Sequence, residues 1–152
     1  MADDINPTLT GAVGEVETFG PTVEVAIQCE GDIVVVRRAV REAADRLGFG
    51  MTDTTRIVTG ASELARNIFR YARPGVMRFR RVDRNGRRGL ELEFEDHGPG
   101  IVDCEQSMVE GFARSGGLGL GLRGTKRIMD EMQIQTEIGK GTTVIVRKWQ
   151  PS

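Results

Sequence analysis

The chain has 152 residues, of which 39% are hydrophobic and 28% are charged, values typical of a soluble globular protein with one domain around one core. Its net charge of −1 at pH 7 argues against a protein that binds nucleic acid through its overall charge. No apolar run approaches the roughly 18 residues of a membrane span, and the N-terminus lacks the pattern of a signal peptide.

The chain has two cysteines, Cys29 and Cys104, which form no Cys-x-x-Cys motif and no cluster with histidine. This spacing favours free thiols over a disulfide framework or a zinc site. We therefore expect a cytoplasmic protein that contacts neither membrane nor nucleic acid.

Residues 1–20 contain four acidic residues and no lysine or arginine, with scattered glycine and proline. This composition predicts a flexible acidic N-terminal segment, followed by one folded domain over residues 21–150. The domain begins with a half-buried strand over residues 22–29, where Val23, Val25 and Ile27 alternate with polar neighbours.

Two helices are predicted next along the chain. Asp32 is expected to cap a helix that runs to Leu47, where glycines end it. A second helix is expected to begin near Thr52 or Asp53 and to end before Pro74, because proline disfavours helical geometry in the residue before it.

The second helix carries two polar residues at the edge of an apolar stripe. Glu63 and Asn67 lie one turn apart and share a face of this helix. By themselves they are typical of a solvated helix face, although the edge of a core is also where a binding pocket can open. The stripe consists of Ile57, Ala61, Leu64, Ile68 and Tyr71.

A β-hairpin follows the helices. Asn85-Gly86 is a strong signal for a tight turn, and Leu90, Leu92 and Phe94 then alternate with glutamates up to Asp96. This alternation predicts an antiparallel sheet with one face in water. Six arginines crowd the hairpin, as expected for a solvated face or a surface that docks an acidic partner: Arg78, Arg80, Arg81, Arg84, Arg87 and Arg88.

The rest of the chain completes an α+β fold. Residues 101–116 read as irregular or partly helical, a helix follows the glycines to about Met132, and strands close the domain over residues 133–138 and 142–149. The order of elements predicts a two-layer α/β sandwich, with a mixed, mostly antiparallel sheet covered on one face by helices.

Asp96 leaves a strand into the glycine-rich turn Asp96-His97-Gly98-Pro99-Gly100. A buried carboxylate there can accept a hydrogen bond from the exocyclic amine of adenine, which guanine cannot supply at that position. Gly98 and Gly100 allow the backbone to turn tightly. The alternative is a plain strand end with a turn-forming aspartate, and we interpret His97 as a loop residue.

A second glycine-rich stretch contains Gly117, Gly119 and Gly121 and precedes a helix. Exposed backbone N–H groups and the positive end of a helix attract phosphates, although a flexible loop would give the same pattern. Arg114 and Lys126 lie close by in sequence and can neutralise phosphate charge. The match to the dinucleotide pattern GxGxxG is accidental, because no apolar strand leads directly into it.

These motifs in this order resemble the Bergerat ATP-binding fold of the GHKL superfamily, which includes gyrase, Hsp90, histidine kinases and MutL proteins. The stretches ASELARNIFRYA, EDHGPGI, SGGLGLGL and GTKRIMDEM are most similar to the RsbT-type serine/threonine switch kinases of the anti-sigma regulatory factor family. The resemblance covers roughly residues 22–149. Gyrase-like and Hsp90-like enzymes carry further domains for which this length leaves no room.

The resemblance implies roles for individual residues. The side-chain oxygen of Asn67 would bind Mg²⁺, Glu63 would orient or deprotonate the attacking hydroxyl, and Arg114 would approach the γ-phosphate of ATP. Either Thr142 or Thr143, beside the turn Gly139-Lys140-Gly141, would form a hydrogen bond near Asp96, and the sequence does not choose between them.

The resemblance also implies an activity: ATP- and Mg²⁺-dependent phosphorylation of serine or threonine on a small STAS-domain protein, which releases the kinase to a phosphatase regulator. Two alternatives remain open. A sister anti-sigma factor would bind a sigma factor directly and phosphorylate an anti-anti-sigma protein, and a non-enzymatic module would bind nucleotide only to set its shape.

Overall fold

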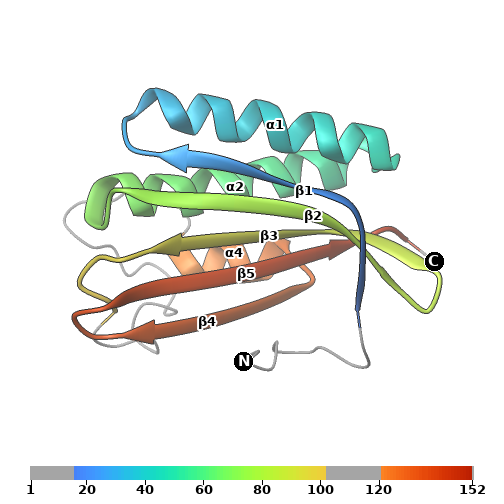
Figure 1. Ribbon diagram of the computed structural model, residues 1–152. Helices are drawn as coiled ribbons and strands as arrows, with labels where there is room; N and C mark the ends of the chain where they lie inside the picture. Colours follow the sequence, from blue (N-terminus) through green and yellow to red (C-terminus); the bar gives the residue numbers. More distant parts are fainter. Residues whose placement is uncertain (1–15, 102–120, 152) are drawn as a thin grey trace.

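The computed structural model describes residues 16–101 and 121–151, which form one sheet and the helices packed on it (Figure 1). Every neighbouring pair in the five-stranded sheet is antiparallel, in the order β1-β2-β3-β5-β4. The elements are β1 Glu17–Ile27, α1 Gly31–Leu47, α2 Met51–Tyr71, β2 Gly75–Arg84, β3 Arg87–Asp96, α4 Gly121–Ile128, β4 Glu131–Glu137 and β5 Gly141–Trp149.

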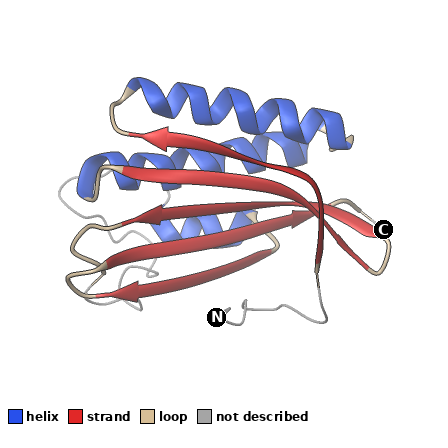
Figure 2. Ribbon diagram, viewed as in Figure 1, coloured by secondary structure: helices blue, strands red, loops and turns tan. Residues whose placement is uncertain are grey.

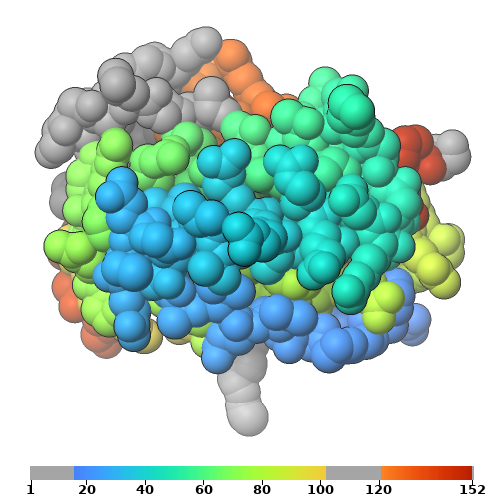
Figure 3. Space-filling model, turned by 90° about the horizontal axis from the view of Figure 1, so that it is seen from above, coloured from blue at the N-terminus to red at the C-terminus, as the bar shows by residue number. Residues whose placement is uncertain are grey.

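The helices lie together on one face of the sheet (Figure 2), so the α+β two-layer sandwich is confirmed. In the space-filling view of Figure 3, α1 and α2 cover this face of the molecule. Within the described ranges, none of the helices has the length and apolar character needed to cross a membrane.

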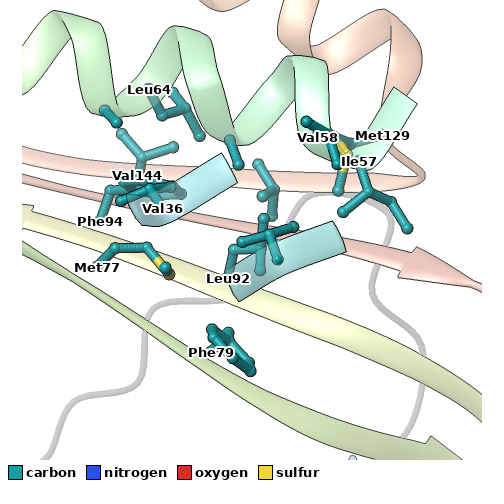
Figure 4. Packing of buried hydrophobic residues seen from close by; sticks show 14 of the residues in the cluster. Val36, Ile57, Val58, Leu64, Met77, Phe79, Leu92, Phe94, Met129 and Val144 are labelled. Carbon is teal, nitrogen blue, oxygen red and sulfur yellow. The ribbon is translucent and has the colours of Figure 1, made fainter. Parts of the chain in front are cut away.

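The hydrophobic core lies between the helices and the sheet. Figure 4 shows Ile57 and Leu64 of α2 packed with Leu92 and Phe94 of β3. The predicted stripe of α2 is buried from Ile57 to Ile68, because residues three and four apart return to the same side of a helix. The core therefore fixes which flank of α2 stays accessible.

The hairpin forms as the sequence predicted. Asn85 and Gly86 have φ values of 55° and 85°, which suit a two-residue turn whose twist matches that of the flanking strands. β2 and β3 pair along their whole length, from Arg84 opposite Arg87 to Gly75 opposite Asp96. The register brings Asp96 to the end of the sheet.

The uncovered face of the sheet carries a row of alternating charges. Arg80, Glu91, Arg147 and Glu131 lie directly opposite one another across β2, β3, β5 and β4. Arg147 Nε donates to Glu91 at 2.8 Å, its Nη1 donates to Glu131 at 3.3 Å, and Arg80 also donates to Glu91. These four side chains are only 6% to 17% exposed. The charges in this row are therefore neutralised within the chain.

Arg78 and Arg84 of the hairpin are paired as well, whereas Arg87 and Arg88 are exposed. Arg78 donates to Glu24 at 2.8 Å and to Glu95 at 2.9 Å, and Arg84 donates to Glu131 at 2.6 Å. A carboxylate of the same chain already neutralises each of these guanidinium groups, which weakens the hypothesis that they dock an acidic partner.

The start of α1 differs from the prediction. The helix begins at Gly31, so Asp32 lies inside its first turn. The Asp32 carboxylate reaches back and accepts the backbone N–H groups of Gln28 at 2.8 Å and Cys29 at 3.1 Å. These backbone hydrogen bonds hold the pKa of Asp32 below its usual value of 3.8.

Two further boundaries differ from the prediction. Strand β1 begins at Glu17, before residue 22, and helix α4 ends at Ile128, before Met132. Past Met129, whose N–H still bonds to the Thr125 carbonyl, the Asp130 N–H donates to the Arg147 carbonyl of β5 at 2.9 Å, and the next strand begins at Glu131. Lys148 of β5 also donates to the Ile128 carbonyl at 3.0 Å, so contacts with a strand distant in sequence accompany this end.

Gly141 brings the β4–β5 hairpin against the end of β3. Its φ is 130°, and a Cβ placed on it would lie 2.1 Å from the Asp96 carbonyl oxygen. Gly139 also has a positive φ, 83°, but a Cβ there would meet nothing within 4 Å. The close approach of Asp96 therefore requires a glycine at position 141, whereas position 139 has room for a side chain.

We expect Gly141→Ala to destabilise the protein more than Gly139→Ala. Both variants place a side chain at a positive φ, a cost of about 1–2 kcal/mol. Gly141→Ala must in addition displace the end of β3, which adds about 1–3 kcal/mol, as overpacking does elsewhere. Urea unfolding measures both free energies, and equal losses for the two variants would contradict the close contact.

Candidate functional site

Asp96 is the last residue of β3, and its two carboxylate oxygens differ in their surroundings. Oδ1 accepts the backbone N–H groups of Gly98 at 2.9 Å and Thr142 at 3.3 Å. No residue in the described ranges donates a hydrogen bond to Oδ2. One oxygen is therefore held by the backbone, and the other is available to a ligand.

The environment of Asp96 opposes its ionisation. Burial raises the pKa of Asp96 above the usual 3.8, and the backbone hydrogen bonds from Gly98 and Thr142 offset part of that rise. Carboxylates whose pKa is raised by burial gather at functional sites, so Asp96 is a candidate site residue.

The turn after Asp96 is wedged between two elements. A Cβ at Gly98 would lie 2.5 Å from Ala72 Cβ, beyond the end of α2, and a Cβ at Gly100 would lie 2.6 Å from the Glu137 carbonyl oxygen of β4. Gly100 also has a φ of 83°. The sequence predicted that these glycines allow a tight turn. The close approach of Ala72 and Glu137 also leaves no room for a side chain at either position.

The structure separates Thr142 from Thr143. Thr142 lies directly opposite Asp96, and directly opposite residues of antiparallel strands project from the same face. Thr143 lies opposite Glu95 and therefore projects from the uncovered face of the sheet. Of the two candidates, only Thr142 is brought to Asp96.

Glu63 and Asn67 lie on the flank of α2 that faces α4. Gly60 shares that flank, and a Cβ on Gly60 would lie 3.5 Å from Thr125 Cγ2 of α4. Both polar residues are half-buried. Arg66 Nη1 donates to Glu63 Oε2 at 2.9 Å, so the Glu63 carboxylate is oriented by its own helix.

Helix α4 points its N-terminal end along this flank. Lys148 Nζ lies 3.0 Å from the Ile128 carbonyl oxygen and 3.8 Å from Asp53 Oδ1, which joins the last turn of α4 to the first turn of α2. The first turn of α4, which begins at Gly121, is therefore directed toward Glu63 and Asn67. The N-terminal end of a helix favours anions in general.

Three other predicted site residues, Arg114, Gly117 and Gly119, lie outside the described residues. Within the described ranges, no group of three or more His, Cys, Asp or Glu residues is placed to hold a metal ion. Lys126 of α4 is exposed.

Sequence reasoning missed two residues of this region. Arg66 follows Glu63 by three positions, the spacing at which charged side chains meet on a helix. Thr136 lies opposite Thr142, with their hydroxyl oxygens 2.9 Å apart. A turn placed at Gly139-Lys140-Gly141 fixes the register of the β4–β5 hairpin, and that register puts Thr136 opposite Thr142.

The raised pKa of Asp96 predicts how nucleotide-free stability depends on pH. A folded-state pKa above the unfolded value stabilises the protein at low pH, and this contribution is lost as pH rises through the folded pKa. Asp96→Asn cannot ionise, so it should exceed wild type in free energy of unfolding at pH 7, and the gain should shrink as pH falls toward 3.8.

Asp32→Asn is the matched control, because the pKa of Asp32 is lowered. Its contribution to stability is present above the unfolded pKa and is lost as pH falls through the folded one, so Asp32→Asn should be less stable than wild type at pH 7. Urea unfolding at several pH values gives both differences. If both substitutions changed the free energy of unfolding at pH 7 in the same direction, the raised pKa of Asp96 and the lowered pKa of Asp32 could not both be right.

Comparison with known proteins identifies the family of this chain. The profile of the histidine kinase-like ATPase domain family matches residues 27–148. The serine/threonine-protein kinase RsbT of Bacillus subtilis (strain 168) is 47% identical over 125 residues, which cover 82% of this chain and 94% of the relative.

A solved structure shares the fold at lower sequence similarity. The crystal structure of the RsbU and RsbW domains of a Mycobacterium tuberculosis protein superimposes with a TM-score of 0.62 at 17% identity. The match covers 88% of this chain and 34% of that longer chain. The chain belongs to the histidine kinase-like ATPase domain family, among the RsbT-type serine/threonine-protein kinases.

Proposed function

We propose that this kinase uses ATP with Mg²⁺ to phosphorylate a serine or threonine of a STAS-domain protein, and that phosphorylation makes the kinase change partners. The observation that carries the proposal is the Asp96 carboxylate, with Oδ2 unpartnered among the described residues and Oδ1 fixed by the backbone. The flank of α2 with Glu63 and Asn67 and the first turn of α4 supply the other parts.

Adenine recognition follows from the free oxygen of Asp96. Its Oδ2 accepts a hydrogen bond from the exocyclic amine of adenine, whereas guanine or hypoxanthine would place a carbonyl oxygen there. Two acceptors facing each other leave both without a partner, which is costly in a buried site. Because Gly98 and Thr142 already hold Oδ1, binding requires little reorganisation of the carboxylate.

The phosphates would lie toward α4. The N–H groups of its first turn, from Gly121 onward, would bind them beside Glu63 and Asn67, and Arg114, Gly117 and Gly119 are proposed to complete this part of the site. The Asn67 side-chain oxygen is a suitable ligand for Mg²⁺, which prefers oxygen and usually keeps substrate phosphates in its shell. Mg²⁺ bound there would neutralise charge on the phosphates.

Glu63 is the proposed general base. Its carboxylate is half-buried and is oriented by Arg66 at 2.9 Å. As the acceptor hydroxyl oxygen attacks the γ-phosphorus, its proton passes to Glu63, and the bond to the bridging oxygen of ADP breaks. A docked partner would supply the in-line hydroxyl, so the free kinase should hydrolyse ATP slowly.

The identity of the partner rests on the RsbT-type relationship. Phosphorylation adds about −1.5 to −2 charges to the acceptor, enough to weaken a close docking surface by repulsion and desolvation. The kinase would then be released to a second partner, proposed to be a phosphatase regulator. The alternative, direct binding of a sigma factor, predicts that a sigma factor co-purifies with the chain.

Substitution of Asn67 tests whether its side chain binds Mg²⁺. Asn67→Ala should weaken ATP binding much more with Mg²⁺ than with a chelator, because the lost oxygen acts only through the ion. Asn67→Asp keeps an oxygen ligand and should retain the Mg²⁺ dependence. Calorimetry under both conditions measures the effect, and equal losses with and without Mg²⁺ would take Asn67 out of the metal shell.

Glu63→Gln should reduce phosphoryl transfer to a STAS-domain protein by about 10²–10⁴-fold, the usual contribution of a general base. ATP affinity should change little, because shape and hydrogen-bonding capacity are nearly kept. Glu42→Gln on α1 is the control, since Glu42 is 68% exposed and pairs only with Arg46 within the described ranges.

Labelled ATP and candidate STAS proteins test the whole proposal. The expected product is an acid-stable phosphoserine or phosphothreonine on the partner, with weaker binding to the kinase afterwards. Transfer by Glu63→Gln at the wild-type rate would remove Glu63 from catalysis. Acid-labile phosphohistidine, or unchanged binding after full phosphorylation, would overturn the partner-switching role.

A further inference from the structure

Three polar residues form one row at the end of the sheet. Asp96 of β3 lies directly opposite Thr142 of β5, and Thr142 lies directly opposite Thr136 of β4. Directly opposite residues in antiparallel strands project from the same face, so all three side chains lie on the face that the helices cover. Thr142 therefore lies between Thr136 and the Asp96 carboxylate in this row.

The Thr136 hydroxyl joins three segments of the chain. It accepts the backbone N–H of Ile101 at 2.9 Å, and it lies 3.3 Å from the Gly141 carbonyl oxygen and 2.9 Å from Thr142 Oγ1. A hydroxyl has one proton to donate and two lone pairs that accept. All three contacts are satisfied together when Thr136 donates to Gly141 and accepts from both Ile101 and Thr142.

This arrangement decides what Thr142 offers to a ligand. With its proton directed into Thr136, the Thr142 hydroxyl exposes only lone pairs beside Asp96. The free Asp96 Oδ2 is also an acceptor when ionised. The edge made by these two residues then carries no donor, which matches the amine of a 6-aminopurine and opposes the carbonyl of a 6-oxopurine.

We propose that Thr136 is a positioning residue for purine choice, which fixes the rotamer and the proton of Thr142 beside Asp96. The inference rests on the proposed reading of adenine by Asp96. Thr136 itself need not contact the base. Its loss would free the Thr142 proton, which could then be donated to the carbonyl oxygen of hypoxanthine.

Calorimetry with ADP and IDP, the hypoxanthine nucleotide, measures the preference as the ratio of the two dissociation constants. Thr136→Val removes the hydroxyl at nearly constant volume and should lower the preference for ADP about two- to twelvefold, the factor expected for one neutral hydrogen bond. Thr136→Ser keeps the hydroxyl and should keep the wild-type preference.

A double-mutant cycle tests whether Thr136 acts through Thr142. In a Thr142→Val background, Thr136→Val should cause no further loss of preference, because the proton that it controls is already gone. Additive losses would overturn this mechanism. Weaker binding of both nucleotides with an unchanged ratio would also overturn it, since that result indicates only a general structural role.

Asp96→Asn separates this inference from the proposed function. If Asp96→Asn abolishes the preference for ADP and Thr136→Val preserves it, the role of Thr136 is wrong and base reading by Asp96 stands. If Asp96→Asn also preserves the preference, the proposed base reading fails and the role of Thr136 fails with it. Thr136→Ala, which removes the hydroxyl without replacing it, is measured in the same way if the valine variant does not fold.

Discussion

The Asp96 carboxylate is the group on which the rest of the site depends. Its Oδ1 is fixed by two backbone N–H groups from different segments, the turn at Gly98 and the strand at Thr142. Both donors are in place only because Gly98 fits against Ala72 and Gly141 fits against Asp96 itself. Four parts of the chain therefore meet around one acid whose burial opposes its own charge.

The end of the sheet and the flank of the helices carry different kinds of polar groups. The end of the sheet, with Asp96, Thr142 and Thr136, offers hydrogen-bond acceptors suited to a base. The flank of α2 that faces α4 carries the carboxylate of Glu63 and the amide of Asn67, groups suited to an attacking hydroxyl and a metal ion. Helix α4 lies against α2 at Gly60, where a Cβ would meet Thr125 and Met129 at 3.5 Å, an ordinary contact distance.

Much of this fold was predictable because local signals agreed with the final structure. The turn at Asn85-Gly86, the alternation that leads to Asp96 and the apolar stripe of α2 each depend on neighbours in sequence. The end of α4 was not predictable, since contacts with a strand distant in sequence accompany it, and the pairing of hairpin arginines depends on glutamates of other strands. For the candidate site, the sequence proposed the motif residues, whereas the placement of Thr142, and not Thr143, opposite Asp96 required the strand register.

The two faces of the sheet use charge in opposite ways. On the uncovered face, Arg80, Glu91, Arg147 and Glu131 neutralise one another within hydrogen-bonding distance. On the covered face, Asp96 keeps an oxygen for which no described residue provides a donor. The pairing on the uncovered face has exceptions, because Arg84 Nε and Gln133 Oε1 are buried there without a hydrogen-bond partner among the described residues. What distinguishes Asp96 is that burial raises its pKa while one of its oxygens stays open to a donor, a combination typical of functional sites, and a ligand that donates to Asp96 Oδ2 would give this oxygen a partner.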